Sequence, residues 1–538
     1  MAASKGKPAD QAELFSASTA KEIQDILWKA ADKLRGSIDA AQYKEFVLGL
    51  IFLKYVSDAF EERRTELAKE LAEDGISEDQ IGDFLEDRDE YTGAHVFWVP
   101  ETARWSWIAT HAKAQGVGKL LDEAMDAIMR ENASLTGVLP KIFNQDRVDQ
   151  KRLGELVDLI SDARFGGSGD KPAQDLLGEV YEYFLGNFAR AEGKRGGEFY
   201  TPSSVVRLIV EILEPYEGRV YDPACGSGGM FVQAAKFIEA HQGSKSNISV
   251  YGQELNERTW RLAKMNLAIH GIDGNLAARW GDTFADDKHA DLKADFVMAN
   301  PPFNIKDWAR DETDPRWKYG VPPKNNANYA WLQHMISKLG EKGTAGIVLA
   351  NGSMTDQQGG QGEIRKAMAE NDLVACMVAL PSQLFRTTQI PACLWFLSRD
   401  KSPQGARRLD DRRGEILFIN ALEMGEMADR TERILSEDDL HKIADIYHAW
   451  RGTESAREAG LAYEDVPGFC YSASLEKVRE QGYVLTPGRY VGTVEVEEED
   501  AQTVAARISK LTEDLYGLFG KSAELEKTVR EQLGRVDG

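Results

Sequence analysis

The sequence predicts an α/β fold, in which a mainly parallel sheet carries helices on both faces and is flanked by helical regions at both ends. Three observations predict it. The middle of the chain alternates short apolar runs with stretches of helical periodicity, as in strand–helix–strand units. A glycine-rich turn at 222–229 separates one such run from a helical stretch. The outer segments carry apolar residues at three- and four-residue spacings.

The length indicates several separately packed regions, since a chain of 538 residues corresponds to about three domains. We expect an N-terminal helical domain over residues 1–165, an α/β domain over 166–429 and a C-terminal helical region over 430–538. The first boundary coincides with Gly166-Gly167-Ser168-Gly169, a run that favours a break. The region before it shows helical spacing from its start, for example at Ile23, Ile26 and Ala30.

The strands and helices of the middle region follow from these patterns. The strand-like runs are Val220 to Asp222, Ile248 to Gln253, Ala277 to Gly281, Phe296 to Ala299, Ala345 to Ala350, Val374 to Leu380, Cys393 to Leu397 and Ile416 to Ile419. The helical stretches are Ala173 to Ala189, Met230 to His241, Arg258 to Ile269, Tyr329 to Leu339 and Glu363 to Glu370. No helix separates the last two strands, so we expect them to form an antiparallel hairpin at one edge of the sheet.

The chain ends in a long polar helix with a seam of apolar residues at alternating four- and three-residue steps, in which Ser522 occupies the one missing position. The residues of this seam are Val504, Ile508, Leu511, Leu515, Leu518, Leu525 and Val529. Such a seam packs on another surface. The pattern fits docking on this chain's own body and docking on a helix of a partner equally well.

Asp222-Pro223-Ala224-Cys225-Gly226-Ser227-Gly228-Gly229 is the first candidate for a binding site. Its glycines permit a tight turn and a close approach of backbone N–H groups to a ligand, and open α/β sheets bind ligands at the carboxyl ends of their strands. The segment does not match GxGxxG, and no GxxxxGK[ST] nucleotide loop occurs in the chain. Taken alone, the segment is also typical of a structural turn.

Two further candidates end the next two strands. Glu254, in Tyr251-Gly252-Gln253-Glu254-Leu255, is placed where a carboxylate accepts hydrogen bonds from ribose hydroxyls in nucleoside-binding α/β folds. In Gly281-Asp282-Thr283-Phe284, the carboxylate of Asp282 suits an adenine amino group and the ring of Phe284 suits stacking on adenine. Each is common as an ordinary strand end or turn. Their order and spacing, one at each strand end, favour a single site.

Asn300-Pro301-Pro302-Phe303 is the most informative segment, and it follows directly on a strand-like run. The prolines fix the backbone and cannot continue the sheet, so the Asn300 side chain and the Pro301 carbonyl become aimed acceptors. Two acceptors on one planar amine favour a more tetrahedral nitrogen and stabilise the charge that develops when it attacks a methylsulfonium. Phe303 offers an apolar face to an extruded base. This chemistry requires no general base and no metal.

Composition limits the remaining possibilities. The four cysteines form no CxxC pair and the eight histidines no HExxH, so we expect no disulfide framework and no metal site. The longest apolar run, Phe46 to Val56, is too short for a bilayer and contains Lys54, and residues 1–10 lack a signal-peptide core. We expect no membrane role and a cytoplasmic location. The net charge of −23 is unfavourable for contact with phosphates, so if the chain acts on a nucleic acid we expect a more basic subunit to supply much of the binding.

The segments together resemble amino-methyltransferases in which a methionine-binding motif precedes the glycine-rich loop and the catalytic tetrapeptide. More closely, the chain is similar to the modification (methyltransferase) subunit of type I restriction–modification systems, over nearly its whole length. The matching segments are Leu34-Arg35-Gly36, Phe46 to Tyr55, Gly197-Glu198-Phe199-Tyr200-Thr201-Pro202, Asp222 to Gly229, Asn300 to Phe303, Leu380 to Phe385 and Ile390-Pro391-Ala392.

This resemblance implies a Rossmann-like class I methyltransferase domain that uses S-adenosyl-L-methionine and methylates N6 of adenine in double-stranded DNA. By position, the expected cofactor-binding residues are Glu198, Tyr200, Thr201, Pro202, Asp222, Ala224, Gly226, Ser227, Gly228, Glu254, Leu255, Asp282, Thr283, Phe284 and Asn300. The residues expected to hold the target adenine are Asn300, Pro301, Pro302 and Phe303.

The resemblance also implies partners. Two modification subunits assemble on one specificity (S) subunit, which reads the DNA sequence, and a separate ATP-driven restriction (R) subunit cleaves. C-terminal helices in this family pack on the specificity subunit, which favours a partner for the seam of residues 504–529.

Two other functions remain compatible with the residues alone. An Asn-Pro-Pro enzyme can act on another planar amine, such as cytosine N4, a guanine amine in RNA or a glutamine side chain. A catalytically silent assembly subunit would keep the fold for binding only. Against the second alternative, competent residues fill every expected motif position.

Overall fold

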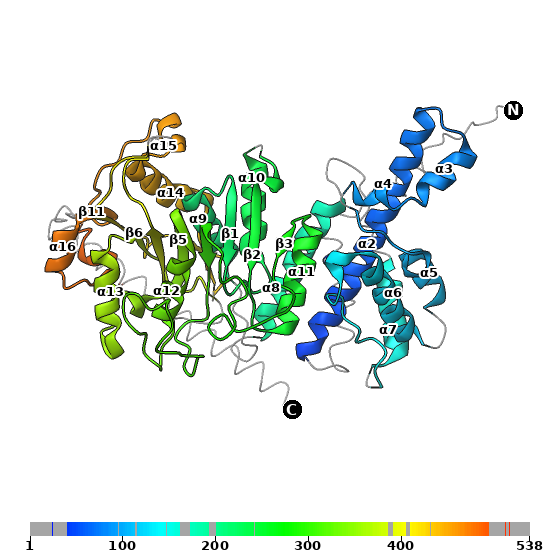
Figure 1. The fold of residues 1–538 in the computed structure, drawn as a ribbon, viewed down its shortest axis with the longest axis horizontal. Helices are drawn as coiled ribbons and strands as arrows, with labels where there is room; N and C mark the ends of the chain where they lie inside the picture. The colour runs from blue at the N-terminus through cyan, green and yellow to red at the C-terminus, as the bar shows by residue number, and fades with distance from the viewer. Residues whose placement is uncertain are drawn as a thin grey trace. The chain divides into compact units, whose positions relative to one another are not determined.

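A computed structural model describes residues 24, 40–94, 96–112, 116–146, 148–161, 173–192, 201–241, 243–385, 391–404, 409–430, 432–493, 512 and 516. Contacts between residues divide the chain into two units, Met1–Val491 and Gly492–Gly538. The first unit contains both the N-terminal helices and the sheet (Figure 1).

Among the described residues, nine strands form one sheet in the order β11-β8-β6-β7-β5-β4-β1-β2-β3. The strands are β1 (Gly218–Asp222), β2 (Ile248–Gly252), β3 (Gly274–Asn275), β4 (Ala294–Ala299), β5 (Leu339–Ala350), β6 (Val374–Ala379), β7 (Ala392–Ser398), β8 (Glu415–Asn420) and β11 (Cys470–Ser474). β1 pairs in parallel with both β2 and β4. The strand order reverses between β1 and β4, and such a switch point leaves a crevice at the strands' carboxyl ends.

Helices cover both faces of this sheet (Figure 1). They are α9 (Ser203–Leu213), α10 (Gly229–Ala240), α11 (Glu257–Ile269), α12 (Asn328–Lys338), α13 (Gln361–Glu370) and α14 (Glu437–Arg451). Alternate residues of β4 point to opposite faces: Met298 belongs to the core under α9, and Val297 to the core under α12. The predicted mainly parallel sheet with helices on both faces is confirmed.

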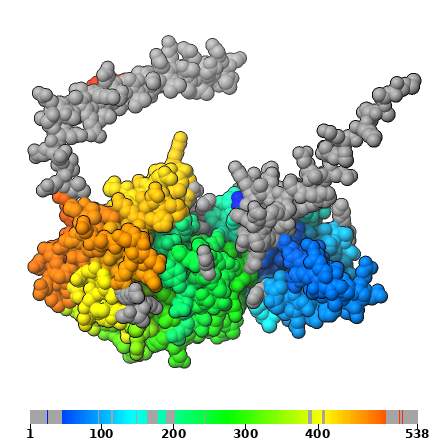
Figure 2. Space-filling view, turned by 90° about the horizontal axis from the view of Figure 1, so that it is seen from above, coloured from blue at the N-terminus to red at the C-terminus, as the bar shows by residue number. Residues whose placement is uncertain are grey.

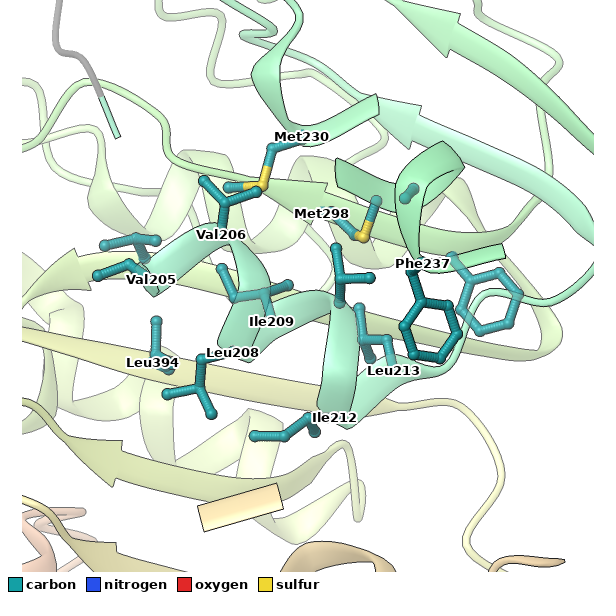
Figure 3. Packing of buried hydrophobic residues seen from close by; sticks show 14 of the residues in the cluster. Val205, Val206, Leu208, Ile209, Ile212, Leu213, Met230, Phe237, Met298 and Leu394 are labelled. Carbon is teal, nitrogen blue, oxygen red and sulfur yellow. The ribbon is translucent and has the colours of Figure 1, made fainter. Parts of the chain in front are cut away.

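α9 shows how closely these layers pack. Figure 3 shows its residue Leu208 beside Leu394 of β7, and its residue Leu213 beside Phe237 of α10. A Cβ built on Gly346 of β5 would lie 2.7 Å from Ile209, so only glycine permits this approach. α9 begins directly after Pro202, so the buried helix fixes the position of that residue at the start of the sheet domain's core.

The regular structure described in the N-terminal region is helical, and irregular segments such as 96–100 and 136–146 connect its helices. Its helices are α2 (Ala40–Glu73), α3 (Glu78–Leu85), α4 (Asp89–Thr92), α5 (Trp105–His111), α6 (Val117–Glu131), α7 (Gln150–Ser161) and α8 (Ala173–Glu192). The apolar run 46–56 is buried in the core of this region. α11 contributes Leu262, Met265 and Ile269 to the same core, which joins the helical region to the sheet. Among the described residues, no helix has the length and apolar character that a membrane crossing requires.

The predicted strand Ala277 to Gly281 is wrong. The strand that pairs with β2 is the short β3, two residues long, and it ends before this run. Ala277 has a φ of +60°, and the Leu276 carbonyl accepts a hydrogen bond from the Trp260 indole at 2.8 Å. The left-handed backbone and the occupied carbonyl end the pairing here.

The predicted hairpin of the last two strands is also wrong. β7 lies inside the sheet, antiparallel to both β5 and β6, and β8 pairs in parallel with β6. Every residue of β6 and β7 is buried, so both strands belong to the centre of the sheet. The antiparallel hairpin is therefore formed by β6 and β7.

Residues 430–491 differ from the helical region expected after residue 429. β11 extends the sheet by pairing with β8, and the ring of Tyr490 stacks on Phe418 of β8 at 3.7 Å between centroids. α14 packs on α9, where His448 bonds the Glu211 carbonyl at 2.8 Å. In Figure 2 the orange residues of this segment lie on the same body as the yellow and green residues. The seam residues predicted within 504–529 all lie outside the described residues, which include only 512 and 516 of this segment.

Replacement of Gly178 should weaken the contact of α8 with the loop after α11, because a Cβ there would lie 2.4 Å from the His270 ring. We expect Gly178→Ala to lower the free energy of unfolding by about 1–3 kcal/mol, as other overpacking substitutions do. Gly82→Ala, whose Cβ meets no atom within 4 Å on exposed α3, is the control and should leave stability unchanged or raised. Equal unfolding temperatures of Gly178→Ala and the wild-type protein would contradict this packing.

Candidate active site

The loops after β1, β2 and β4 border a cavity of about 580 Å³. Pocket volumes of this size hold nucleoside-sized ligands. The cavity is lined by Lys44, Leu185, Phe188, Pro223, Ala224, Gly226, Ser227, Glu254, Leu255, Asn256, Thr259, Leu262, Asp282, Thr283, Phe284, Asn300, Pro302, Ile305, Lys306, Asp307, Trp308 and Trp331.

The glycine-rich loop after β1 is held open toward this cavity. Gly226 has a φ of +55°, and a Cβ built on it would meet no protein atom within 4 Å. Its N–H donates to Oε2 of Glu254 at 3.1 Å, which ties the loop to the end of β2. The Thr283 hydroxyl donates to the Pro223 carbonyl at 2.6 Å and ties the loop to the next one. The loop therefore has a fixed conformation with open space above its glycine.

Asp222 lies beneath this loop and is 2% exposed. Its Oδ1 accepts the N–H of Ala224 at 2.9 Å. Burial, together with the negative charge of Glu254, raises the pKa of Asp222 to about 8, although the Ala224 hydrogen bond opposes the shift. The carboxyl group is therefore largely protonated at neutral pH in the ligand-free protein.

Glu254 and Leu255 form the rim next to the loop. Glu254 accepts the N–H of Asn256 at 2.8 Å through Oε1, so both carboxylate oxygens take part in backbone hydrogen bonds. Leu255 is 63% exposed and offers an apolar surface at the cavity mouth. Asn256 caps α11 by accepting the N–H groups of Arg258 and Thr259, which fixes the rim on that helix.

The segment Asp282-Thr283-Phe284 forms the opposite wall. The Phe284 ring is buried, with its centroid 4.3 Å from that of Trp331 and 4.9 Å from that of Trp308. Arg316 donates to the carbonyls of Thr283 and Phe284 at 2.9 and 2.8 Å. Oδ1 of Asp282 accepts the Phe284 N–H at 2.8 Å. The aromatic rings, the Arg316 guanidinium and this hydrogen bond together fix the position of the wall.

Asn300 faces the cavity from the end of β4 and is 9% exposed. Its Nδ2 donates to the Thr201 hydroxyl oxygen at 2.8 Å. Its Oδ1 is buried and has no hydrogen-bond partner in the described part of the chain. A buried acceptor without a partner costs about 1–3 kcal/mol, and a ligand that donates an N–H removes this cost.

The segment after Asn300 has an unusual backbone. Pro302 lines the cavity, whereas Phe303 is half-buried with its centroid 6.2 Å from that of Phe385. Asn304 and Asp307 have φ values of +53° and +56°. Asn and Asp adopt this left-handed region more readily than other residues with a side chain, and the two positions turn the chain sharply after the prolines.

The structure brings most of the predicted site residues together. The predicted residues that line the cavity are Ala224, Gly226, Ser227, Glu254, Leu255, Asp282, Thr283, Phe284, Asn300 and Pro302. The predicted residues that lie nearby without lining it are Thr201, Pro202, Asp222, Gly228, Pro301 and Phe303. Glu198 and Tyr200 lie outside the described residues.

Sequence reasoning missed a second group of lining residues. Trp308 and Trp331 come from the long connection after β4 and from α12, where isolated tryptophans give no local signal of a site. Lys44 of α2, with Leu185 and Phe188 of α8, comes from the N-terminal helices. Their helical periodicity indicated only burial, so nothing local pointed to this wall.

Comparisons with known proteins agree with this geometry. Residues 172–499 match the family described as N-6 DNA Methylase, and residues 23–161 match the HsdM N-terminal domain. The chain belongs to the N-6 DNA methylase family. It is 50% identical to the Type I restriction enzyme HindI methylase subunit of Haemophilus influenzae, over 81% of this chain and 99% of the relative. It is 37% identical to the MjaIX methylase subunit of Methanocaldococcus jannaschii, over 95% and 91% of the two chains.

The fold agrees as well. A type I methyltransferase subunit from Streptococcus thermophilus has a TM-score of 0.72 at 24% identity, over 88% of this chain and 100% of that one. The N-6 DNA methylase therefore transfers a methyl group from S-adenosylmethionine to N6 of adenine in DNA, as the modification subunit of a type I system. The family's description names an N-6 position of DNA, which favours adenine N6 over the other planar amines. The open space above Gly226 fits the cofactor, and the unpartnered, buried Asn300 Oδ1 fits the target amine.

The raised pKa of Asp222 predicts a pH-dependent stability. Between its ordinary value of 3.8 and about 8, the unfolded chain is ionised while the folded chain stays protonated, so rising pH lowers stability. Asp222→Asn keeps a side-chain oxygen that accepts the Ala224 N–H, but it has no ionisable group and so does not lose stability as the pH rises. Between pH 6 and pH 8 its stability should gain on wild type by about 1 kcal/mol or more, the equivalent of one pKa unit.

Scanning calorimetry of the two ligand-free proteins at pH 6, 7 and 8 measures this difference. Asp291→Asn removes an exposed aspartate and serves as the control. If the unfolding free energies of wild type and Asp222→Asn change equally between pH 6 and pH 8, the carboxyl group is ionised in the folded protein and the raised pKa of Asp222 is refuted.

Proposed function

We propose that the Asn300 side-chain oxygen and the Pro301 carbonyl accept the two N–H groups of the target adenine amine. The observation that carries this proposal is that Asn300 lines the cavity while its side-chain Oδ1 is buried without a hydrogen-bond partner in the described part of the chain. The prolines that follow fix the backbone, so Pro301 cannot turn its carbonyl away at low cost.

The acceptors act on the nitrogen's electron pair. In free adenine this pair is delocalised into the ring, and two in-line acceptors favour the pyramidal nitrogen and stabilise its developing positive charge. When bound, S-adenosylmethionine supplies an electrophilic methyl group. The carbonyl and amide oxygens are preorganised, and the buried position of Asn300 excludes water that would compete for them.

The remaining site residues hold the cofactor and the base in this proposal. Glu254 holds the ribose from the rim, supported by its fixed position beside Gly226. Asp282, Thr283 and Phe284 border the adenine of the cofactor, and Ser227 and Leu255 line the same space. Tyr200, with Glu198, Thr201 and Pro202, contacts the methionine part. Phe303 offers its face to the flipped base from beside Phe385.

The second part of the proposal concerns the subunits with which this chain assembles. We propose that two copies of this chain assemble on one specificity subunit, bind double-stranded DNA in the cytoplasm and recruit the restriction subunit. The C-terminal seam of residues 504–529 contacts the specificity subunit.

Asn300→Ala should abolish methyl transfer while it leaves cofactor affinity nearly unchanged, because the lost oxygen contacts the base. Removal of one preorganised charge-stabilising group lowers turnover by about 100- to 1000-fold in other enzymes. The assay measures tritium transfer from labelled S-adenosylmethionine to DNA in the complex with the partner subunit. Calorimetry measures cofactor affinity separately.

Asn325→Ala provides the matched control, because Asn325 is an exposed asparagine of the same connection after β4 and does not line the cavity. It should methylate DNA at the wild-type rate. Full activity of Asn300→Ala, or an equal loss of cofactor binding and transfer, would refute the assigned role.

Deletion of residues 504–538 should leave the catalytic unit folded and weaken assembly. The contacts that close the sheet, including Tyr490 on Phe418, precede the deletion, so the unfolding temperature should stay unchanged. The mass of the complex on gel filtration with the specificity subunit should fall to those of the separate proteins. An unchanged complex mass would exclude the seam as the assembly surface.

A further inference from the structure

We propose that Arg316 is a positioning residue for the cofactor, because its guanidinium group fixes the backbone of the cavity wall at Thr283 and Phe284. It donates to the carbonyl groups of these two residues at 2.9 and 2.8 Å. Both residues line the cavity, whereas Arg316 does not, so Arg316 acts on a ligand through the wall. This inference rests on the proposed function, in which Asp282, Thr283 and Phe284 border the adenine of S-adenosylmethionine.

The wall needs such support because it belongs to no strand or helix. A backbone outside regular structure is held by the side chains and turns that bond to it. Within the wall, Oδ1 of Asp282 accepts the N–H of Phe284 at 2.8 Å, which shapes the turn locally. The Thr283 hydroxyl ties the wall to the glycine-rich loop. Arg316 ties the two carbonyl groups to the opposite side.

All five N–H groups of the guanidinium have acceptors inside the protein. Nε donates to the Asp314 carboxylate at 2.8 Å, and Nη2 donates to the same carboxylate and to the Phe284 carbonyl. Nη1 donates to the Thr283 carbonyl and, at 3.0 Å, to Nδ1 of His334. A guanidinium group can only donate, so the direction of every bond is fixed. No N–H group remains for a cofactor or a phosphate, and the residue is therefore a support rather than a ligand-binding group.

His334 of α12 connects this support to the sheet. Because Arg316 donates to Nδ1, the neutral imidazole carries its hydrogen on Nε2 and donates it to the Tyr221 hydroxyl oxygen at 3.1 Å. The ring is neutral because burial and the charge of Arg316 hold the pKa of His334 well below its ordinary value. Tyr221 is buried in β1, directly before Asp222 and the glycine-rich loop. The wall and that loop are therefore set on one buried framework.

The shape of the arginine side chain matters here as much as its charge. An ammonium group is a point charge on a flexible stem and does not reproduce a fork of five donors. Arg316→Lys keeps the positive charge and loses the fork, so it separates the geometry of the support from its charge. Asp314→Asn is the complementary change, because it leaves the guanidinium in place and removes the charge that fixes it.

Two measurements test the inference: calorimetry of S-adenosylmethionine binding to the full chain, and single-turnover transfer of a tritiated methyl group to DNA in the complex with the specificity subunit. We expect Arg316→Lys to raise the cofactor dissociation constant about tenfold or more, since two part-buried carbonyl groups lose their donors. The rate of transfer at saturating cofactor should stay within about threefold of wild type, because the groups that act on the base are unchanged. Asp314→Asn should raise the same constant by a smaller factor.

Arg451→Lys is the matched control. Arg451 is buried and also donates to backbone carbonyl groups, those of Lys401, Asp410 and Ser402, none of which lines the cavity. Its replacement should lower the unfolding temperature measured without cofactor, as that of Arg316 should, and leave the cofactor dissociation constant unchanged. If Arg451→Lys weakens cofactor binding as much as Arg316→Lys does, the effect is a general loss of packing and the inference fails.

Asp282→Ala tests the proposed function separately, because Asp282 itself lines the cavity. If Asp282→Ala binds the cofactor weakly and Arg316→Lys binds it at wild-type strength, the inference fails while the assignment of the wall stands. If both bind it at wild-type strength, the assignment of the wall to the cofactor fails as well. Slower transfer by Arg316→Lys at saturating cofactor, with unchanged affinity, also overturns the inference. Should Arg316→Lys not fold, an unchanged dissociation constant of Asp314→Asn overturns it.

Discussion

The parallel pairing of β1 with β4 is the constraint on which the rest of the structure depends. Val220 pairs with Phe296 and Tyr221 with Val297, so the two strands end side by side. The glycine-rich loop after Asp222 and the loop after Ala299 therefore leave the sheet at neighbouring points. Because the strand order reverses there, no strand lies between the two loops, and one cavity borders both.

Much of the sheet could be predicted from the sequence, because its central strands are buried on both faces and read as apolar runs. The errors arose where pairing depends on distant residues. The strand after Ile272 ends early because the Trp260 indole takes the Leu276 carbonyl. β11, with two serines among its five residues, has no apolar run, and it exists because β8 offers an open edge. Local periodicity contains neither fact.

The candidate site divides in the same way. Residues at strand ends could be predicted because the ends of parallel strands meet at one edge, and Gly226, Glu254 and Asn300 do line one cavity. Trp331 and Lys44 could not, since each lies on a helix whose periodicity explains its burial without reference to a ligand. The bond from Asn300 to Thr201 is equally invisible, because it joins residues 99 positions apart.

The cavity also concentrates two polar features that a stable fold ordinarily avoids. Asp222 is a carboxyl group buried so deeply that its pKa rises to about 8, and Asn300 presents a buried oxygen without a partner in the described part of the chain. Each destabilises the ligand-free protein by an amount on the order of a kcal/mol or more. In the proposed function a positively charged cofactor would favour the ionised carboxylate and a donated N–H would satisfy the oxygen, so binding would relieve both features. The large apolar cores on either face of the sheet offset these losses, which is why the site can be held ready before its ligands arrive.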